Sequence, residues 1–340
     1  MGILRFLTRT LNSVAAGAIF GVALTAAGVY SPSVIIGQMQ LSDFHMLKAF
    51  LAASASSALA IILAQRLGLT ACKPRTPNTL NLFSSYDGNI LGGALLGVGM
   101  ALSGACPGTL LPQIATGVRS GPFVLLGGLL GGILFSGYGK RFVRTVRDKE
   151  AISKPTVYQK IGGKRKTAMA VYEVLCLSCL GAMRNVYPEK VGVLISAAIG
   201  GLWIGFSQFM SLLLTGSTLG VSTAYEQIGD LFWWAEQLLL GGKTGPMPSI
   251  RGTAFAIGTL FGALILSVVV QIPSPNENIE VGFARAVIGG ILLVVGARFA
   301  GGCTSGHGIS GMSQLSVSSI LTSAAMFGGG IVSSAVLRLF

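Results

Sequence analysis

A sixteen-residue, glycine-rich apolar stretch that ends in cysteine occurs twice in this chain, 197 residues apart. The first copy covers residues 91–106 (LGGALLGVGMALSGAC) and the second covers residues 288–303 (IGGILLVVGARFAGGC). Four glycines of each copy stand at matching positions, and so do the terminal cysteines, Cys106 and Cys303. The repetition predicts a chain of two related halves, each of which delivers one thiol to an equivalent place.

The chain is too poor in charge to cover a water-facing surface. Charged residues make up 10% of its 340 residues, hydrophobic residues make up 51%, and the mean hydropathy is +0.72, whereas a soluble domain carries about 25% charged residues. This composition predicts an all-α polytopic membrane protein, because only helices and closed barrels satisfy their backbone in lipid. Apolar stretches of spanning length lie near residues 13–30, 44–66, 89–105, 121–138, 190–210, 249–272, 283–302 and 319–339.

A ninth stretch, residues 168–183, decides how the two halves relate. About eight or nine transmembrane helices are expected in total. If residues 168–183 span the membrane, the two halves have inverted orientations; if they do not, the two halves are parallel. The residues leave both open, and we favour inversion. The chain then divides into a first repeat half (1–139), a basic loop with a short helix (140–183) and a second repeat half (184–340).

The net charge of +13 is concentrated in one loop. Residues 140–170 hold ten basic side chains against Asp148 and Glu150. A basic loop between apolar spans is typical of the cytoplasmic side and also suits contact with anionic membrane lipids, so nucleic acid is not an expected partner. We expect an integral, multi-pass protein of the plasma (inner) membrane with this loop in the cytoplasm.

Several segments are too short and too rich in Gly, Ser and Thr to cross a membrane. Residues 107–117 and 304–316 directly follow the repeated cysteines, and residues 215–223 and 31–37 are similar. Non-helical backbone at membrane depth is tolerated only around protein or a polar cavity. We therefore expect re-entrant or broken helices around a polar path, with ordinary extramembrane loops as the alternative. Proline-containing connectors, residues 66–86 and 271–280, precede the repeated helices.

Both cysteine motifs resemble sites for a small anion. Pro107 suits a first helical position, which makes Cys106 an expected N-cap and leaves the N–H groups of Gly108 and Thr109 at an open, anion-attracting helix end. In the second motif Cys303 is followed by hydroxyls and flexible glycines. The candidate substrate-binding residues of that motif are Cys303, Thr304, Ser305, Gly306 and His307.

Arg298, five residues before Cys303, is an expected counter-charge, because an arginine inside an apolar helix usually faces a polar cavity. A structural role for Arg298 is equally compatible with the sequence. Neither motif holds a carboxylate, so a metal site is not expected, and no cofactor is expected either. Thiols add a preference for soft, polarisable sulfur. Farther along, Glu226, Asp230 and Glu236 are expected on a water-facing side, near interfacial Tyr225, Trp233 and Trp234.

These motifs carry a family resemblance. GARFAGGCTSGHGISG (residues 296–311) resembles the signature of the YeeE/YedE sulfur-transport family, and GMALSGACPGT (residues 99–109) is similar to its first-half motif. The resemblance implies an hourglass-like helical bundle with paired short helices and cysteines that pass thiosulfate along by transient hydrogen bonds. It also implies a third cysteine near the end of the first helix, where this chain has Tyr30 or Ser31, and a cytosolic partner of the TusA sulfurtransferase type.

The sequence thus predicts a transporter, not an enzyme, that takes up thiosulfate or a similar sulfur anion. Cys106 and Cys303 would contact the substrate sulfur, and the neighbouring N–H and hydroxyl groups would hold its oxygens. Two alternatives stay open at this point. One is a membrane sulfurtransferase that forms a cysteine persulfide, since a helix N-terminus favours a thiolate. The other is a passive channel for small anions.

Overall fold

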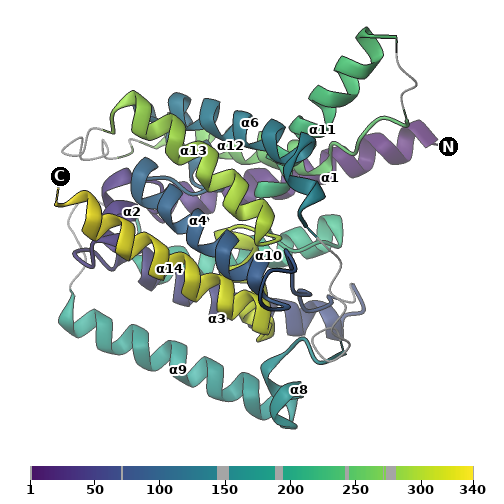
Figure 1. Cartoon of the computed structure of the whole chain (residues 1–340). Coiled ribbons are helices and arrows are strands. Elements are labelled where there is room, and N and C mark those ends of the chain that lie inside the picture. The colour runs from purple at the N-terminus through teal and green to yellow at the C-terminus, as the bar shows by residue number, and fades with distance from the viewer. Residues whose placement is uncertain are drawn as a thin grey trace.

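The chain forms a bundle of helices (Figure 1). The computed structural model describes residues 2–69, 72–143, 153–187, 194–241, 245–270, 272 and 281–339. Within these ranges no β-strand occurs, and one isolated antiparallel bridge joins Thr156 to Ser316. The helices of the first half are α1 (Gly2–Ala26), α2 (Pro32–Met39), α3 (His45–Arg66), α4 (Asp87–Ser103), α5 (Leu110–Ala115), α6 (Gly121–Gly137) and η1 (Gly139–Arg141). Those that follow are α8 (Val157–Ile161), α9 (Arg165–Val186), α10 (Ala197–Thr215), α11 (Ser222–Leu239), α12 (Arg251–Val269), α13 (Phe283–Phe299), η2 (Thr304–Gly311), η3 (Met312–Gln314) and α14 (Val317–Leu337).

The two halves of the chain interlock instead of forming separate bodies. Helix α1 packs on α12 while α3 packs on α10, and α4 packs on α14 while α6 packs on α13. Each pair joins a helix of one half to a helix of the other. Exchanging the halves converts each pairing into its counterpart, so the internal repeat of the sequence is a repeat of the structure.

The repeated glycine-rich helices α4 and α13 cross at the centre and run antiparallel. A Cβ on Gly92, near the start of α4, would lie 2.3 Å from the backbone nitrogen of Ala300, just after the end of α13. A Cβ on Gly99, near the end of α4, would lie 2.5 Å from the nitrogen of Leu293. Small residues therefore let the two backbones touch. Equivalent helices that run in opposite directions are the arrangement of inverted repeats.

Helices α1 and α10, the first of each half, repeat this antiparallel relation. The Asn12 side-chain amide donates to the carbonyl of Leu214 at 2.9 Å, which joins the middle of α1 to the end of α10. At the opposite end, a Cβ on Gly200 would lie 2.5 Å from the Cβ of Ala27.

Six helices in the described ranges are long and apolar enough to cross a membrane: α1, α3, α9, α10, α12 and α14. A seventh span results if α13 and the following short helices count as one, bent by 43°. Two of the stretches expected to span, α4 and α6, have 17 residues each and fall short of that length. The prediction of an all-α polytopic membrane protein is confirmed.

Two helices differ from the sequence-based expectation. The segment near 168–183 is a 22-residue helix, α9, and not a short one; it lies outside α3 (Figure 1), where the Tyr172 hydroxyl is 2.6 Å from that of Ser54. Helix α11 was not expected at all, because its polar residues interrupt the apolar pattern. It packs on α6 and α12, and its C-terminal end projects from the bundle (Figure 1).

The short segments after the cysteines lie in the interior, and so does α2, the short helix before α3. All eight residues of η2 are buried, and so are four of the six residues of α5 and seven of the eight residues of α2. The connector at residues 66–86 is tied to α4 through the buried Asp87 carboxylate, which accepts the N–H groups of Leu80 and Leu82, both at 2.6 Å. Burial by itself raises the pKa of Asp87, but these hydrogen bonds outweigh it and hold the pKa at about 2. The corresponding connector at residues 271–280 lies outside the described residues, except for Ile272.

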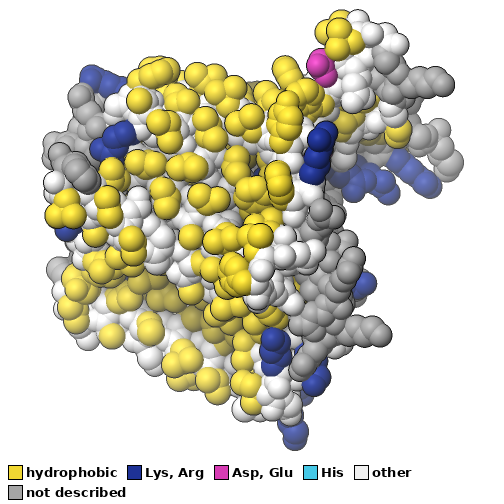
Figure 2. Space-filling model, viewed as in Figure 1, with side chains coloured by type: hydrophobic (Ala, Val, Ile, Leu, Met, Phe, Trp, Pro, Cys, Tyr) yellow, Lys and Arg dark blue, Asp and Glu magenta, His cyan; other side chains and the backbone are white. Residues whose placement is uncertain are grey.

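Basic side chains gather at one end of the molecule. Figure 2 shows hydrophobic side chains spread over the flank of the bundle and many Lys and Arg side chains at the end where the N-terminus and α8 lie. Arg165, at the start of α9, donates to Gln65 at the end of α3 with a distance of 2.7 Å, so both helix ends meet there. We call this the basic end. Residues 144–152 of the basic loop lie outside the described residues.

Candidate functional site

The first thiol is presented by the turn that ends α4. Gly104 has φ +62°, in the left-handed region that favours glycine, and a Cβ there would lie 2.8 Å from the Pro32 Cβ. Cys106 follows two residues later and is 4% exposed. The Thr109 hydroxyl and N–H lie 3.3 and 3.4 Å from its sulfur as donors, while the Cys106 N–H donates to that hydroxyl at 2.9 Å.

The expectation that Cys106 is a helix N-cap is wrong in detail. Helix α5 begins at Leu110, with Thr109 as its N-cap. The Cys106 carbonyl does accept the N–H of Leu110 at 3.0 Å, so a helical turn precedes α5. The Thr109 N–H points at the thiol sulfur and is not open, because the side chain of the cysteine folds back over the turn.

The second thiol stands at the equivalent junction between α13 and η2. Gly301 has φ +79° and is packed against the Asn78 side chain, where a Cβ would lie 2.8 Å from the amide nitrogen. Cys303 is fully buried, and its sulfur lies 3.2 Å from the Ser305 hydroxyl. The backbone N–H of Gly306 and both the backbone and the hydroxyl of Ser222 also lie near this sulfur.

The two motifs converge. Cys106 and Cys303 belong to one buried cluster that includes residues of α4 and α13, and Thr304 of the second motif lies near the Cys106 thiol. The two halves therefore deliver their thiols to one region in the centre of the bundle.

A small cavity of about 30 Å³ lies beside this region. Its lining includes residues of both cysteine motifs, namely Cys106, Gly108, Thr109, Thr304 and Ser305. The remaining wall is apolar and consists of Phe20, Leu24, Val29, Met46, Ala49, Phe50, Ala53, Ile204 and Ile309. Five of the sequence-predicted residues thus share one cavity surface.

Arg298 lies in the interior as expected, but its charge is already balanced. It forms an ion pair with Glu226 and donates to the Ser222 hydroxyl at 3.4 Å. Lys140 adds ion pairs to Glu226 at 2.9 Å and to Asp230 at 2.5 Å, and Ser136 donates to Asp230. Burial lowers the pKa of Lys140, but these hydrogen bonds outweigh it and raise the pKa overall.

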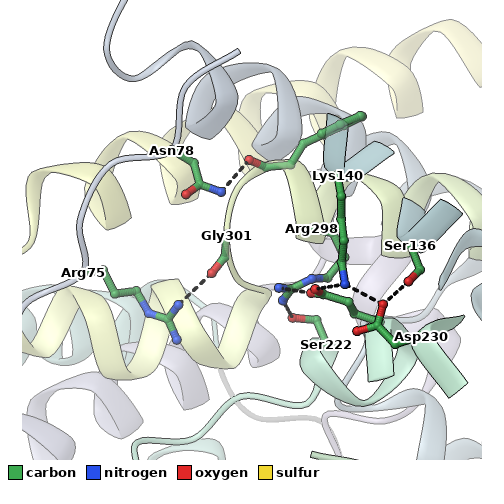
Figure 3. A network of polar contacts seen from close by, with 10 residues as sticks. Arg75, Asn78, Ser136, Lys140, Ser222, Asp230, Arg298 and Gly301 are labelled. Carbon is green, nitrogen blue, oxygen red and sulfur yellow. Dashed lines mark hydrogen bonds and ion pairs between the residues drawn. The ribbon is translucent and has the colours of Figure 1, made fainter. Parts of the chain in front are cut away.

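This network corrects the expectation for the α11 acids. Glu226 and Asp230 point into the bundle and hold Lys140 and Arg298 (Figure 3). Against the expectation of a water-facing side, their side chains are only 17% and 29% exposed. Two carboxylates face two cations here, so the network is neutral.

Three other predicted residues lie apart from the cavity lining. Both ring nitrogens of His307 are occupied: Nε2 donates to the Ala300 carbonyl at 3.0 Å, and Nδ1 lies 2.9 Å from the Ser319 hydroxyl. Ser31 begins α2, and its hydroxyl lies 2.8 Å from that of Ser33. Tyr30 is 4% exposed, and its carbonyl accepts the Gln113 amide at 2.8 Å. These positions frame the site.

Sequence reasoning missed two residues beside Cys303. Ser222 belongs to the 215–223 segment that stood out as non-spanning, which was its only signal. Arg75 comes from the connector between α3 and α4, and its Nη1 donates to the Gly301 carbonyl at 2.9 Å. A basic residue in a polar connector resembles a solvated one, so nothing in the sequence marked Arg75.

A second, polar hollow of about 430 Å³ lies at the basic end, between α1, α10 and the starts of α11 and α12. Its charged lining residues are Arg9 and Arg251, and many of the others carry hydroxyls, namely Ser13, Ser211, Thr215, Ser217, Thr218, Thr223 and Ser249. The described residues that line it include no Asp or Glu. Such a lining attracts anions.

Known proteins resemble this chain in sequence. A sequence model of the family described as "Sulphur transport" matches residues 26–332. A probable transporter of Xylella fastidiosa (strain 9a5c) is 30% identical over 142 residues, which cover 42% of this chain and 93% of that protein. The thiosulfate transporter TsuA of Spirochaeta thermophila is 24% identical over 325 residues, which cover 90% of this chain and 92% of that protein.

Proposed function

The chain belongs to the sulphur transport family, and from this premise we propose that it carries thiosulfate, or a similar small sulfur anion, across the membrane and into the cell. A relative that aligns over 90% of the chain is named a thiosulfate transporter, which supports this substrate. The observation that carries the proposal is the central cavity, whose lining combines Cys106, hydroxyl-bearing residues of both cysteine motifs and apolar side chains.

This lining suits an anion with two unlike ends. The oxygens of thiosulfate need hydrogen-bond donors, which Thr109, Thr304 and Ser305 supply. Its terminal sulfur is larger, softer and less strongly hydrated, so it loses less than an oxygen would against an apolar wall or a thiol. Sulfate, which presents oxygens on every side, would leave acceptors unpaired against that wall, at a cost of about 1–3 kcal/mol for each.

We assign roles on the same basis. Cys106 and Cys303 contact the substrate sulfur in turn, with the backbone of Gly108 and Gly306 close by. Arg298 acts through the Ser222 hydroxyl, which it shares with Cys303. Tyr30, Ser31 and His307 hold the surrounding segments in place. No chemical change at the thiols is part of this mechanism.

We further propose that the basic end faces the cytoplasm, because loops rich in Lys and Arg stay on that side, and that the membrane is the plasma (inner) membrane. The imported sulfur anion would leave the protein at this basic end. A small cytosolic sulfurtransferase of the TusA type is the partner that would receive it, and anionic lipid headgroups would contact the surrounding basic side chains.

The test is uptake of ³⁵S-thiosulfate by cells that express the wild type, Cys106→Ser or Cys303→Ser. We expect both variants to lose most of the uptake, because serine keeps a donor but lacks the polarisable sulfur. Cys179→Ser is the matched control, since Cys179 is exposed on α9, and it should transport normally. Undiminished uptake in both Cys106→Ser and Cys303→Ser would remove the thiol mechanism.

Mass spectrometry separates transport from sulfur transfer. A persulfide would add about 32 Da to the chain, the mass of one sulfur atom. We expect no such adduct on Cys106 or Cys303 after exposure to thiosulfate. An adduct at either cysteine would favour a sulfurtransferase, and equal uptake of formate or chloride would favour a passive channel.

A further inference from the structure

A divalent anion in this cavity needs a counter-charge that the cavity lining does not contain. Moving a bare charge into a low-dielectric interior is costly unless it is paired. The lining offers thiol, hydroxyl and backbone donors, which are all neutral. Arg298, which the sequence suggested for this task, is already paired with Glu226 in a network of two cations and two carboxylates. The compensating cation must therefore come from elsewhere.

Arg75 is a cation on the opposite side of the Gly301 turn from Arg298. Figure 3 shows the Arg75 side chain reaching Gly301 from one side, while Arg298, Lys140 and Asp230 form a separate cluster on the other. Among the described residues, no carboxylate lies within ion-pair distance of Arg75. Its charge acts on Cys303, and the two are close enough for an electrostatic interaction. Arg75 thus places an unneutralised positive charge beside the second thiol.

The position of Arg75 is built into the fold. Its carbonyl accepts the hydroxyls of Ser316 and Ser318 at 2.9 and 3.1 Å, which ties the connector to the start of α14. Its guanidinium lies directly against the cysteine loop, because a Cβ on Gly302 or on Gly306 would lie 2.7 Å from one of its nitrogens. One donor binds the Gly301 carbonyl, and a guanidinium has five. Hydrogen bonds of its backbone carbonyl and of its guanidinium therefore both hold Arg75 in this position.

Arg75 also lies behind the polar hollow at the basic end. A Cβ on Gly220, a residue that lines the hollow, would lie 3.8 Å from Nη2 of Arg75. The next polar residue after Gly220 is Ser222, whose hydroxyl lies near the Cys303 sulfur. Arg75 and Cys303 therefore flank the segment that separates the hollow from the interior, and an anion that travels between them passes both.

We infer that Arg75 is the anion-binding residue of this pathway, which takes a divalent sulfur oxyanion from Cys303 and passes it toward the hollow lined by Arg9 and Arg251. The inference rests on the proposed transport function and adds the residue that neutralises the substrate. A planar guanidinium fork binds two oxygens of one anion at once, while the thiol retains the sulfur end. Arg9 and Arg251 then attract the anion outward, since the described lining of the hollow holds no acid.

The test compares Arg75→Gln and Arg75→Lys with the wild type and with Lys73→Gln, which removes an exposed charge from the same connector. We expect Arg75→Gln to lower kcat/KM for ³⁵S-thiosulfate uptake about 10- to 100-fold, the equivalent of one charge-assisted hydrogen bond. Arg75→Lys keeps the charge but not the fork, so it should retain an intermediate rate. Lys73→Gln should match the wild type.

A second measurement separates binding from a structural role. Thermal unfolding of each purified protein in detergent at low salt, with and without thiosulfate, reports ligand binding as a rise in Tm. The wild type, Lys73→Gln and, to a lesser extent, Arg75→Lys should show this rise, and Arg75→Gln should not. Should Arg75→Gln prove too unstable to purify, Arg75→Lys decides: a preserved rise supports binding through the charge, and an absent rise contradicts it.

These measurements distinguish a wrong assignment of Arg75 from a wrong transport function. If Arg75→Gln keeps both its uptake and its thiosulfate-induced rise, the assignment of Arg75 is overturned while thiosulfate transport stands. The same holds if Arg75→Gln lowers Tm in the absence of thiosulfate but keeps the rise, because Arg75 would then be structural only. If the wild type itself shows neither uptake nor a rise in Tm, the proposed substrate is wrong, and the inference is lost with it.

Discussion

The crossing of α4 and α13 brings both cysteine motifs together, and a single methyl group placed there tests the fold. In Gly92→Ala, the new Cβ would lie 2.3 Å from the nitrogen of Ala300, 2.7 Å from the oxygen of Gly296 and 2.8 Å from the carbonyl carbon of Phe299. All three atoms are backbone and cannot turn aside. Since ordinary contacts of a Cβ begin near 3.4 Å, the helices must separate by about 1 Å at this point. Overpacking of this kind costs about 1–3 kcal/mol.

Gly328→Ala in α14 is the matched control, because a Cβ there meets no atom within 4 Å. Both substitutions gain the same helix propensity, up to about 1 kcal/mol, so the difference between the two variants isolates the packing term. We expect Gly92→Ala to unfold at a lower temperature than Gly328→Ala by about 2–12 °C, at roughly 2–4 °C per kcal/mol for domains of 150–250 residues.

Thermal unfolding of the two purified proteins in detergent, followed by tryptophan fluorescence, measures this difference. Uptake should fall as well in Gly92→Ala, because Ala300 lies three residues before Cys303. Equal unfolding temperatures for the two variants would show that α4 and α13 are not in backbone contact at Gly92, and the antiparallel crossing argued above would be wrong.

Three further substitutions probe separate contacts. Glu226→Gln leaves Arg298 without its carboxylate, so thermal unfolding should report a loss of about 2–4 kcal/mol, and combining it with Arg298→Gln should recover part of that loss. Asp87→Asn loses charge-assisted bonds such as the one from Leu82 and should cost about 1.5–3 kcal/mol. The pKa of Asp87 is depressed to about 2 in the folded protein, against about 3.9 in the unfolded chain. The stabilisation that the ionised carboxylate provides is therefore present above about pH 3.9 and is lost as the pH falls toward 2. In this pH range the wild type should lose stability, whereas Asp87→Asn should not. In Gly302→Ala a Cβ would lie 2.7 Å from a guanidinium nitrogen on one side and 2.9 Å from the His307 ring on the other, so radiolabelled uptake should fall more than the unfolding temperature does.

Repetition and hydropathy were enough to predict the architecture. Two of the four matching glycines in each motif lie where α4 and α13 touch, namely Gly92, Gly99, Gly289 and Gly296. Part of the pattern that revealed the repeat is therefore also its packing surface. Helix α11 was missed because hydropathy averages over a helix: Glu226 and Asp230 lower the mean, although each is paired in the bundle. A paired acid and a solvated acid look the same in a sequence.

The candidate site could be predicted where its residues are adjacent in the chain. Cys106, Gly108 and Thr109 share one turn, as do Thr304 and Ser305, and all five line one cavity. The contacts of Cys303 with Ser222 and of Arg75 with Gly301 join residues that are about 80 and 226 positions apart. Local spacing contains no information on such pairs. The sequence therefore suggested a charge-balancing role for Arg298 but did not reveal its ion pair with Glu226.

The repeat also explains why these long-range partners matter. A two-fold related backbone offers two equivalent thiol positions, and identical surroundings would give the anion no preference between them. In this chain the surroundings differ: the position of Arg298 in the second half is Ala101 in the first, and Arg75 approaches Cys303 alone. Both cations therefore lie on the side of the second motif, and the cationic lining of the hollow continues that gradient toward the basic end. Symmetry of the helices thus builds the path, while asymmetry of the charges gives an anion a lower electrostatic energy at one end of it than at the other.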